Sequence, residues 1–292
     1  MEYVPAKTIV QKTKNRYWFG TDYNMNIYRG CCHGCIYCDS RSDCYRVGEF
    51  GRVRAKENAL TIIRENLRSK TKTGVVATGS MSDPYNPFEE DLRLTRRALE
   101  LLSAYSFGVA IATKSPLVCR DADILLDIGS QAPALVKITI TAADDATAQK
   151  IEPHAAPSSD RFASVEYLAG QGVFTGILLM PVLPYITDDD SNIRRIVQMA
   201  SDSGAKFIIA AMGLTMRDGQ REYFYDELDA HFPGIRQKYI KLFGLDYQCP
   251  SPREKELWAL FKQECRQRNI LYNMQDVINA YQSGYATQLK FY

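Results

Sequence analysis

GCCHGCIYC, at residues 30–38, is the stretch from which the rest of the chain is best interpreted. Cys31, Cys35 and Cys38 follow a C-x3-C-x2-C spacing, and the aromatic Tyr37 stands directly before the last of them. Protein iron–sulfur clusters normally take four cysteine ligands, so a cluster held by three thiolates keeps one iron open. The spacing therefore predicts chemistry at a cluster rather than electron transfer alone.

Two other metal sites match parts of this stretch. Cys32, Cys35 and Cys38 fit C-x2-C-x2-C, which begins a bacterial ferredoxin run, but Ser42-Asp43 stand where that run needs Cys-Pro. A structural zinc site needs a second ligand pair, and no further CxxC or HxxxH follows. Spacing alone leaves two registers open, one with Cys31 as the first ligand and one with Cys32.

Length and composition predict one large domain. The chain has 292 residues, of which 46% are hydrophobic and 24% charged, as in ordinary globular proteins. Its first 15 residues lack the apolar core of an export signal, and the chain has no apolar run of about 18 residues. We therefore expect a cytoplasmic protein that does not enter membranes, with its eight cysteines reduced or bound to metal.

Charge gives a weaker indication of partners. The net charge of +2 does not by itself predict nucleic-acid binding. Basic residues do gather locally, however, first in an N-terminal arm and then around the first expected helix: Lys7, Lys12, Lys14 and Arg16, followed by Arg52, Arg54, Lys56, Arg64, Arg68, Lys70 and Lys72. Such groups either contact phosphates of DNA or RNA or form a solvated helix face.

Short apolar runs alternate with amphipathic segments, a pattern typical of parallel βα units. We expect strands over residues 23–28, 75–78, 108–113, 136–141, 176–180 and 206–211. Helical periodicity lies between them, and again near 253–268. The predicted fold class is α/β, a partial (β/α)6 barrel. We divide the chain into a basic arm (1–22), the barrel (23–215) and a mostly helical C-terminal extension of the same domain (216–292).

The notable motifs follow the expected strands. The cysteine loop comes after the first strand, GSMSDP after the second and Lys114 after the third, while Thr139 and Thr141 lie at the end of the fourth. Active sites of (β/α) barrels are built at the carboxyl ends of the strands. We therefore expect these motifs to meet at one site.

The chain resembles the radical S-adenosylmethionine (radical SAM) superfamily, and within it the branch related to spore photoproduct lyase. The resemblance rests on CxxxCxxC with its penultimate aromatic, and on four further stretches. It covers NIYRGCCHGCIYCDSRSDCY (26–45), GSMSDPYNPFEEDLRLTRRALELL (79–102), ATKSPLVCRD (112–121), IEPHAAPSSDRFASVEYLAGQG (151–172) and MPVLPYITDD (180–189). It implies a 4Fe–4S cluster on Cys31, Cys35 and Cys38, and S-adenosylmethionine cleaved to a 5′-deoxyadenosyl radical. It also implies an external electron donor such as flavodoxin or ferredoxin.

The resemblance also implies roles in holding S-adenosylmethionine. Ser82 and Asp83 would approach its amino group and Lys114 its carboxylate, with help from Thr139. Glu152 and Arg161 would bind the ribose or each other. The adenine pocket would be lined by Tyr37, Met180 and Val182, residue types that are also common in a plain core.

The chain departs from spore photoproduct lyase where the substrate reacts. Ser80 stands at the position of that enzyme's hydrogen-donating cysteine, and Asp39 replaces the aromatic after the third cluster cysteine. A hydroxyl hydrogen is held too tightly to quench a carbon radical readily, so lyase activity on thymine dimers is not expected. Replacement donors are sought among the other cysteines: Cys44, Cys119, Cys265 and, as the best candidate, Cys249 in a proline-bounded loop.

Three function classes follow. The first is a radical enzyme acting on a nucleic-acid base or nucleotide, and the second is a radical enzyme acting on a peptide or small molecule. The third, a non-catalytic iron–sulfur protein, is disfavoured by the motifs for S-adenosylmethionine.

Overall fold

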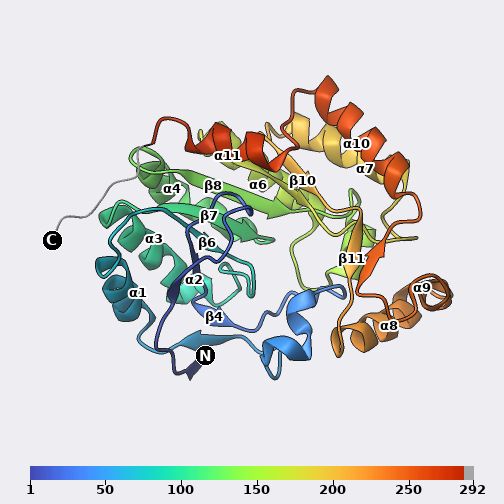
Figure 1. The fold of residues 1–292 in the computed structure, drawn as a ribbon, viewed down its shortest axis with the longest axis horizontal. Coiled ribbons are helices and arrows are strands. Elements are labelled where there is room, and N and C mark those ends of the chain that lie inside the picture. The colour runs from blue at the N-terminus through green and yellow to red at the C-terminus, as the bar shows by residue number, and fades with distance from the viewer. Residues whose placement is uncertain (286–292) are drawn as a thin grey trace.

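The computed structural model describes residues 1–285 and shows an α/β fold built on one seven-stranded sheet (Figure 1). The strand order is β10-β9-β8-β7-β6-β3-β2, and only β2 runs antiparallel to its neighbour. The strands are β2 (Val10–Lys12), β3 (Tyr23–Met25), β6 (Val75–Thr78), β7 (Gly108–Thr113), β8 (Ala134–Thr139), β9 (Thr175–Leu179) and β10 (Ile208–Ala210). The six parallel strands predicted from the sequence are thus confirmed, within one mostly parallel sheet.

Helices connect the parallel strands, and most of them cover one face of the sheet. They are α1 (Ala59–Arg68), α2 (Glu89–Leu92), α3 (Leu94–Ala104), α4 (Ala122–Gly129), α5 (Asp145–Ile151), α6 (Ser158–Gly170) and α7 (Asp190–Asp202). On β7, Val109 and Ile111 belong to the core beneath the helices, while Ala110 belongs to a second cluster on the opposite face. This alternation follows from the two-residue period of a strand. We call the face opposite the helices the inner face.

The inner face is covered by the segment around Phe19 and by α11 (Met274–Gln282). The amide of Phe19 donates to the sulfur of Met274 (3.3 Å), and its carbonyl accepts from the hydroxyl of Tyr281. The ring of Phe19 packs on that of Phe207, just before β10, with 5.7 Å between their centres. An aromatic layer therefore supports the sheet from the inner side.

Two smaller sheets stand beside the main one. In the first, β5 (Arg54–Lys56) lies between β1 (Glu2–Val4) and β4 (Tyr28–Arg29). In the second, β11 (Gly213–Thr215) pairs with β12 (Gln248–Pro250), and the chain between them forms α8 (Gln220–His231) and α9 (Ile235–Phe243). The helix expected near 253–268 is α10 (Glu254–Gln267), which packs on α7. The described residues also contain short 3-10 helices: η1 (Asp39–Arg41), η2 (Asp43–Tyr45) and η3 (Pro116–Asp121).

The structure corrects the first expected strand. Residues 23–28 do not form one strand, because β3 ends at Met25 and β4 begins at Tyr28 in another sheet. The chain leaves the main sheet here, and the carbonyl of Ile27 accepts from the amide of Lys56 instead (3.0 Å). This departure carries the cysteine loop to one side of the sheet, an effect that apolar periodicity does not encode.

The ends of the chain also differ in detail from expectation. The expected arm, 1–22, contains β1 and β2, and β2 is an edge strand of the main sheet. Residues 286–292 of the expected extension lie outside the described residues. Within residues 1–285, no helix combines the length and apolarity needed to cross a bilayer.

Candidate iron–sulfur and cofactor site

The cysteine loop is held in place by backbone hydrogen bonds to two other segments. The amide of Cys31 donates to the carbonyl of Phe50 (2.8 Å), and the amide of Ile36 donates to that of Ile151 (2.9 Å). Gly30 begins the loop with a φ of +82°, and a Cβ atom there would lie 2.3 Å from the carbonyl oxygen of Arg52. Only glycine fits that close approach, so this residue contributes to the position of the whole loop.

The cysteines of the loop differ in their surroundings. Burial raises the pKa of Cys35 most; the charge of Lys114 lowers it, and the charges of Glu152, Cys38 and Cys31 raise it further. Burial likewise raises the pKa of Cys31 to about 11, with a small contribution from Cys38. For Cys32 the contributions after burial come from its own backbone and from Asp83, and its side chain packs against the main core. The assignment of the cluster to Cys31, Cys35 and Cys38 stays a prediction.

The thiols of the cysteine loop fit an iron–sulfur cluster by their chemistry. In residues 1–285, no three His, Cys, Asp or Glu side chains converge on one ion-sized position. A 4Fe–4S cluster makes a different demand, because each iron takes its own thiolate and the sulfurs need not converge. The donor set is also chemically suited, since soft thiolates favour iron–sulfur clusters.

Lys114, Glu152 and Arg161 form a buried charge network beside the cysteine loop. Glu152 and Arg161 are each 1% exposed, and their Oε2 and Nη1 atoms are 2.5 Å apart. The Nζ of Lys114 lies 3.9 Å from Oε1 of Glu152, which also accepts from the hydroxyl of Tyr37. Two cations thus share one carboxylate, and the excess positive charge favours binding of an anion.

The same network explains the protonation of Lys114. Burial lowers its pKa, but the charges of Cys35 and Glu152 outweigh burial and raise the pKa above its ordinary value. Lys114 therefore stays an ammonium, as binding of a substrate carboxylate requires. Arg161 is further fixed by hydrogen bonds from Nη1 to the carbonyl of Thr139 (2.9 Å) and from Nε to that of Ala156 (2.7 Å). Two roles were expected for Glu152 and Arg161, namely binding the ribose or pairing with each other. The structure shows that they pair with each other.

Asp83 joins three parts of the site. Its Oδ1 accepts from the amide of Tyr85 (2.8 Å) and the hydroxyl of Thr113 (2.7 Å), and its Oδ2 accepts from the amide of Lys114 (2.8 Å). Nδ1 of His33, in the cysteine loop, lies 3.5 Å from the same Oδ2. This carboxylate therefore ties the loop after β6 to the end of β7 and to the cysteines. Its expected approach to the amino group of S-adenosylmethionine stays a prediction.

The other residues expected to hold S-adenosylmethionine lie in different parts of the structure. The hydroxyl of Ser82 donates to the carbonyl of Tyr28 (3.1 Å), so this side chain also serves inside the protein. Thr139 ends β8, where it lies beside Leu178 of β9. Met180 follows β9 and packs against the inner-face cluster. Val182 lies in the main core.

Cys249 is not in a loop, which corrects the expectation. It lies in β12 opposite Leu214 and is 1% exposed, with Sγ 3.5 Å from the carbonyl of Asp246. It belongs to the same apolar cluster as Cys35 and Tyr37. The sequence missed this strand because β12 has three residues and pairs with a segment more than 30 residues away.

Two further residues of interest were missed as well. His33 contacts Asp83, and the only local signal was its place between cluster cysteines. Lys137 lies within β8 and is 1% exposed. Its signal was a lysine interrupting the apolar run ALVKIT.

Comparison with known proteins identifies the family. The sequence model of the radical SAM superfamily matches residues 25–209, well over half of the chain, and this range holds the cysteine loop and the charge network. The chain belongs to the radical SAM superfamily. It is therefore a radical SAM enzyme, and its cofactors are a 4Fe–4S cluster and S-adenosylmethionine.

Relatives in sequence span bacteria and archaea. The chain is 27% identical over 260 residues to an uncharacterized protein of Mycobacterium bovis, an alignment covering 86% of this chain and 76% of the relative. It is 31% identical over 188 residues to an uncharacterized protein of Methanocaldococcus jannaschii, covering 63% of this chain and 68% of the relative.

Among solved structures, this radical SAM enzyme is similar to spore photoproduct lyase complexed with dinucleoside spore photoproduct. The TM-score is 0.69 at 14% identity, and the match covers 93% of this chain and 81% of that one. It is also similar to the radical S-adenosylmethionine methyltransferase TsrM from Kitasatospora setae, with a TM-score of 0.56 at 13% identity, covering 90% and 56% of the two chains. At such identities the likeness concerns the fold.

Proposed function

We propose that this radical SAM enzyme acts on a nucleic-acid base or nucleotide. The observation that carries the proposal is a basic segment held against the cysteine loop. Residues 41–56 contain five basic and two acidic residues, and Phe50 within them accepts the hydrogen bond from Cys31. Arg46 and Arg52 of this segment are exposed. Arginines beside the radical site are suited to hold the phosphates that flank a reacting base.

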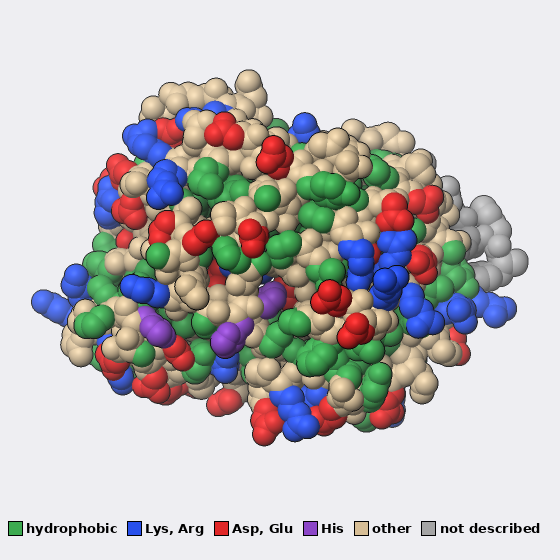
Figure 2. Space-filling view, turned by 180° about the vertical axis from the view of Figure 1, so that it is seen from behind, with side chains coloured by type: hydrophobic (Ala, Val, Ile, Leu, Met, Phe, Trp, Pro, Cys, Tyr) green, Lys and Arg blue, Asp and Glu red, His purple; other side chains and the backbone are tan. Residues whose placement is uncertain are grey.

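The fold supports the same substrate class. Spore photoproduct lyase, with a similar arrangement of strands and helices, was solved with a dinucleoside lesion bound. Figure 2 shows Lys and Arg side chains on the face opposite that of Figure 1, some of them in a group and others singly, interspersed with acidic side chains. Positive charge therefore gathers in places, although the net charge of the whole chain is only +2.

The chain's own residues would prepare the cofactor for this chemistry. When bound, the cluster supplies the electron that cleaves S-adenosylmethionine to a 5′-deoxyadenosyl radical. Lys114 would hold the carboxylate of the cofactor, while Glu152 and Arg161 keep that ammonium in position. The electron would come from a donor such as flavodoxin or ferredoxin, in the cytoplasm, where thiols stay reduced.

We do not expect this enzyme to restore thymines from spore photoproduct. Ser80 is exposed in the loop after β6, at the position expected for the lyase's donor thiol. Cys249 is the replacement donor that we propose, since it packs in the same cluster as Cys35. Its burial raises its pKa to about 11, so it would act as a thiol.

The alternative is a small-molecule substrate. TsrM was solved with a tryptophan substrate, so a similar fold accommodates a small molecule. A metabolite or peptide would need no phosphate contacts, and its binding would depend weakly on salt. This difference separates the two classes.

The test measures binding of a single-stranded oligonucleotide by fluorescence anisotropy at several salt concentrations, without oxygen. We expect affinity to fall steeply with salt, because phosphate contacts release counterions. Arg46→Gln combined with Arg52→Gln should weaken binding and reduce the salt slope, whereas Lys255→Gln, on the distant α10, should change neither. Salt-independent or absent binding would contradict the proposal. Transfer of deuterium from a labelled oligonucleotide into 5′-deoxyadenosine would then identify the reacting base.

A further inference from the structure

Asp39, which directly follows Cys38, connects two exposed tyrosines at the surface. It begins η1, which packs against α8 (Figure 1). Its Oδ1 accepts from Nε of Arg217 (3.0 Å), and its Oδ2 accepts from the hydroxyl of Tyr45 (2.8 Å). Nη2 of Arg217 in turn donates to the hydroxyl of Tyr247, just before β12 (2.9 Å). We call these four residues, Asp39, Tyr45, Arg217 and Tyr247, the tyrosine surface.

The tyrosine surface is open to solvent. Tyr45 is 38% exposed, Tyr247 is 43% exposed, and the side chain of Arg217 is 37% exposed. The guanidinium of Arg217 lies over the Tyr247 ring, 4.5 Å from its centre, and so covers one face of that ring. A ligand can reach both rings without passing through the protein. Because the hydroxyl groups are already held by the ion pair, binding on these rings would cost little side-chain freedom.

The tyrosine surface adjoins the expected reaction site. Ser40, in the same short helix η1, donates from its hydroxyl to the carbonyl of Ser80 (3.5 Å). Ser80 stands at the position expected for the lyase's donor thiol. Tyr45 and the exposed Arg46 are adjacent, and both belong to the basic segment 41–56. The two rings therefore lie between the loop that carries Ser80 and the residues proposed to hold phosphates.

Exposed aromatic rings beside basic groups are typical of surfaces that bind single-stranded nucleic acid. Each base has a flat face that stacks on an aromatic ring, while arginine contacts the phosphates. In a duplex these faces are hidden in the stack of base pairs, so stacking on protein rings favours a single strand. The fold itself gains little from the group, since ion pairs exposed to this degree contribute little stability.

We propose that Tyr45 and Tyr247 are substrate-binding residues on which the bases flanking the reacting nucleotide stack. This inference rests on the proposed function and adds to it the form of the substrate, a single strand of nucleic acid. It also gives Asp39 and Arg217 a role, because they hold the two rings in position.

The test measures the affinity of reconstituted full-length protein for two strands, by fluorescence anisotropy without oxygen. One strand is oligothymidylate and the other is an abasic strand of the same length, so the two carry the same phosphates and differ only in their bases. Tyr45→Ala and Tyr247→Ala should each weaken binding of oligothymidylate by about five- to hundredfold. Their affinity for the abasic strand and their salt slope should stay as in the wild type. Tyr167→Ala, which removes a similarly exposed ring on α6, should change none of these.

Phenylalanine variants separate stacking from the contacts of the hydroxyl groups. Tyr45→Phe and Tyr247→Phe keep the rings but remove the hydrogen bonds with Asp39 and Arg217. They should retain most of the affinity for oligothymidylate that the alanine variants lose. Equal losses in the phenylalanine and alanine variants would assign the tyrosines a structural role and overturn the inference.

The other outcomes separate this inference from the proposed function. Absent or salt-independent binding would overturn both. Steep salt dependence would leave the proposed function standing, and the inference alone would fall if the wild type bound the two strands equally. It would also fall if the alanine variants bound oligothymidylate as the wild type does, or lost affinity equally for both strands. If an alanine variant did not fold, the wild type would decide, since a preference for oligothymidylate supports the inference and equal affinities overturn it.

Discussion

At the scale of single residues, side chains of the same type have different surroundings in the structure. Cys31 and Cys32 are adjacent, yet the amide of Cys31 donates to the carbonyl of Phe50 while the side chain of Cys32 packs against the core. Lys114 and Lys137 are both buried lysines, yet one has a carboxylate beside it and the other an aromatic ring. The two members of each pair differ in the groups beside them and not in their residue type.

The cysteine register gives the first prediction. Alanine at Cys31, Cys35 or Cys38 should abolish the 4Fe–4S cluster, because each thiolate holds its own iron. Cys32→Ala should retain it, as should the exposed control Cys44→Ala. Iron and sulfide analysis with the visible spectrum, on anaerobically purified protein, measures the result. Cluster loss in Cys32→Ala together with retention in Cys31→Ala would reverse the assignment.

Lys114 gives the second prediction. Lys114→Ala should weaken binding of S-adenosylmethionine by about 2 to 3 kcal/mol, because a shielded charge-assisted contact is lost. Calorimetry on the cluster-loaded protein measures the change. Lys206→Ala, an exposed residue before β10, should bind as the wild type does. Equal affinities of Lys114→Ala and wild type would remove Lys114 from the cofactor site.

Lys137 gives a third prediction, on pH. Its pKa is about 7 in the folded protein, against about 10.4 in an unfolded chain. Between these values the unfolded chain binds a proton that the folded protein does not, so this residue makes stability rise with pH. Lys137→Met should be the more stable protein below about pH 7, by on the order of several kcal/mol, with the difference shrinking toward pH 10. Urea unfolding across this range measures it, and parallel curves for the two proteins would contradict the expected burial.

At the scale of elements, the site depends on loops that are tied together after neighbouring strands. The loop after β6 starts at Gly79, where a Cβ would lie 1.9 Å from the carbonyl oxygen of Ala112. Its Asp83 then binds Thr113 and the amide of Lys114. The position of Lys114 therefore depends on two loops at once.

Thr113 tests this connection. Thr113→Val keeps the shape but removes the donor to Asp83, leaving a buried carboxylate with one hydrogen bond fewer. We expect the free energy of unfolding to fall by about 1 to 3 kcal/mol. Cofactor binding should weaken less than in Lys114→Ala, because the ammonium itself remains. Thr71→Val, in an exposed turn, should change stability by less than about 0.5 kcal/mol. Indistinguishable unfolding curves for the two variants would refute this role of Thr113.

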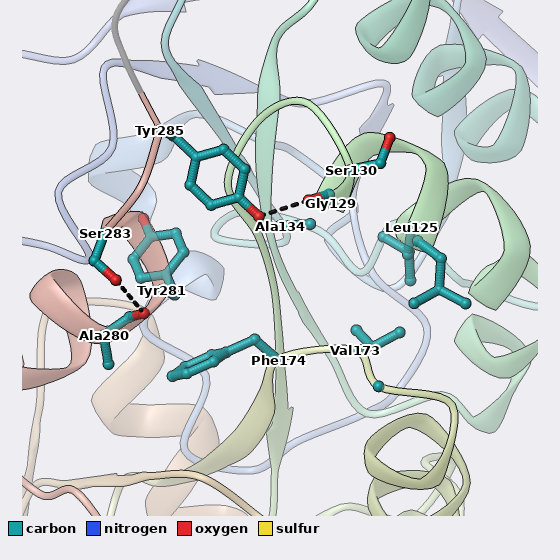
Figure 3. Close-up of a pocket in the computed structure, with 12 residues that line it drawn as sticks. Leu125, Gly129, Ser130, Ala134, Val173, Phe174, Ala280, Tyr281, Ser283 and Tyr285 are labelled. Atoms are coloured by element: carbon teal, nitrogen blue, oxygen red, sulfur yellow. Dashed lines mark hydrogen bonds between the residues drawn. The ribbon is translucent and has the colours of Figure 1, made fainter.

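At the scale of the whole molecule, the sheet brings the cofactor site and the buried lysine to the same inner face. The cavity in Figure 3 lies elsewhere, between α4, the start of β9 and the end of α11, and is about 450 Å³. The hydroxyl of Tyr285 donates to the carbonyl of Gly129 there, joining the end of the described chain to α4. This contact stabilises the amino end of the sheet, opposite the carboxyl ends where radical SAM chemistry is expected.

The reaction gives a prediction at this scale. Reduced protein with S-adenosylmethionine should form 5′-deoxyadenosine, yet it should not restore thymines from spore photoproduct, because Ser80 offers no thiol to quench the product radical. Chromatography of both products measures this. Efficient restoration by the wild type would refute the prediction, unless Cys249→Ala lost the activity, which would identify Cys249 as the donor.

Apolar periodicity was enough to predict the six parallel strands, and the resemblance of short motifs was enough to predict the family, because a buried strand and a motif are each written in adjacent residues. Other features could be seen only in the folded protein, because they depend on contacts between residues far apart in the chain. Folding placed Cys249 in a strand, paired Glu152 with Arg161, gave Asp83 its bonds to three segments, and buried Lys137 against the ring of Phe19. Such contacts join residues far apart in the chain, and their energies depend on burial, which only the packed molecule sets.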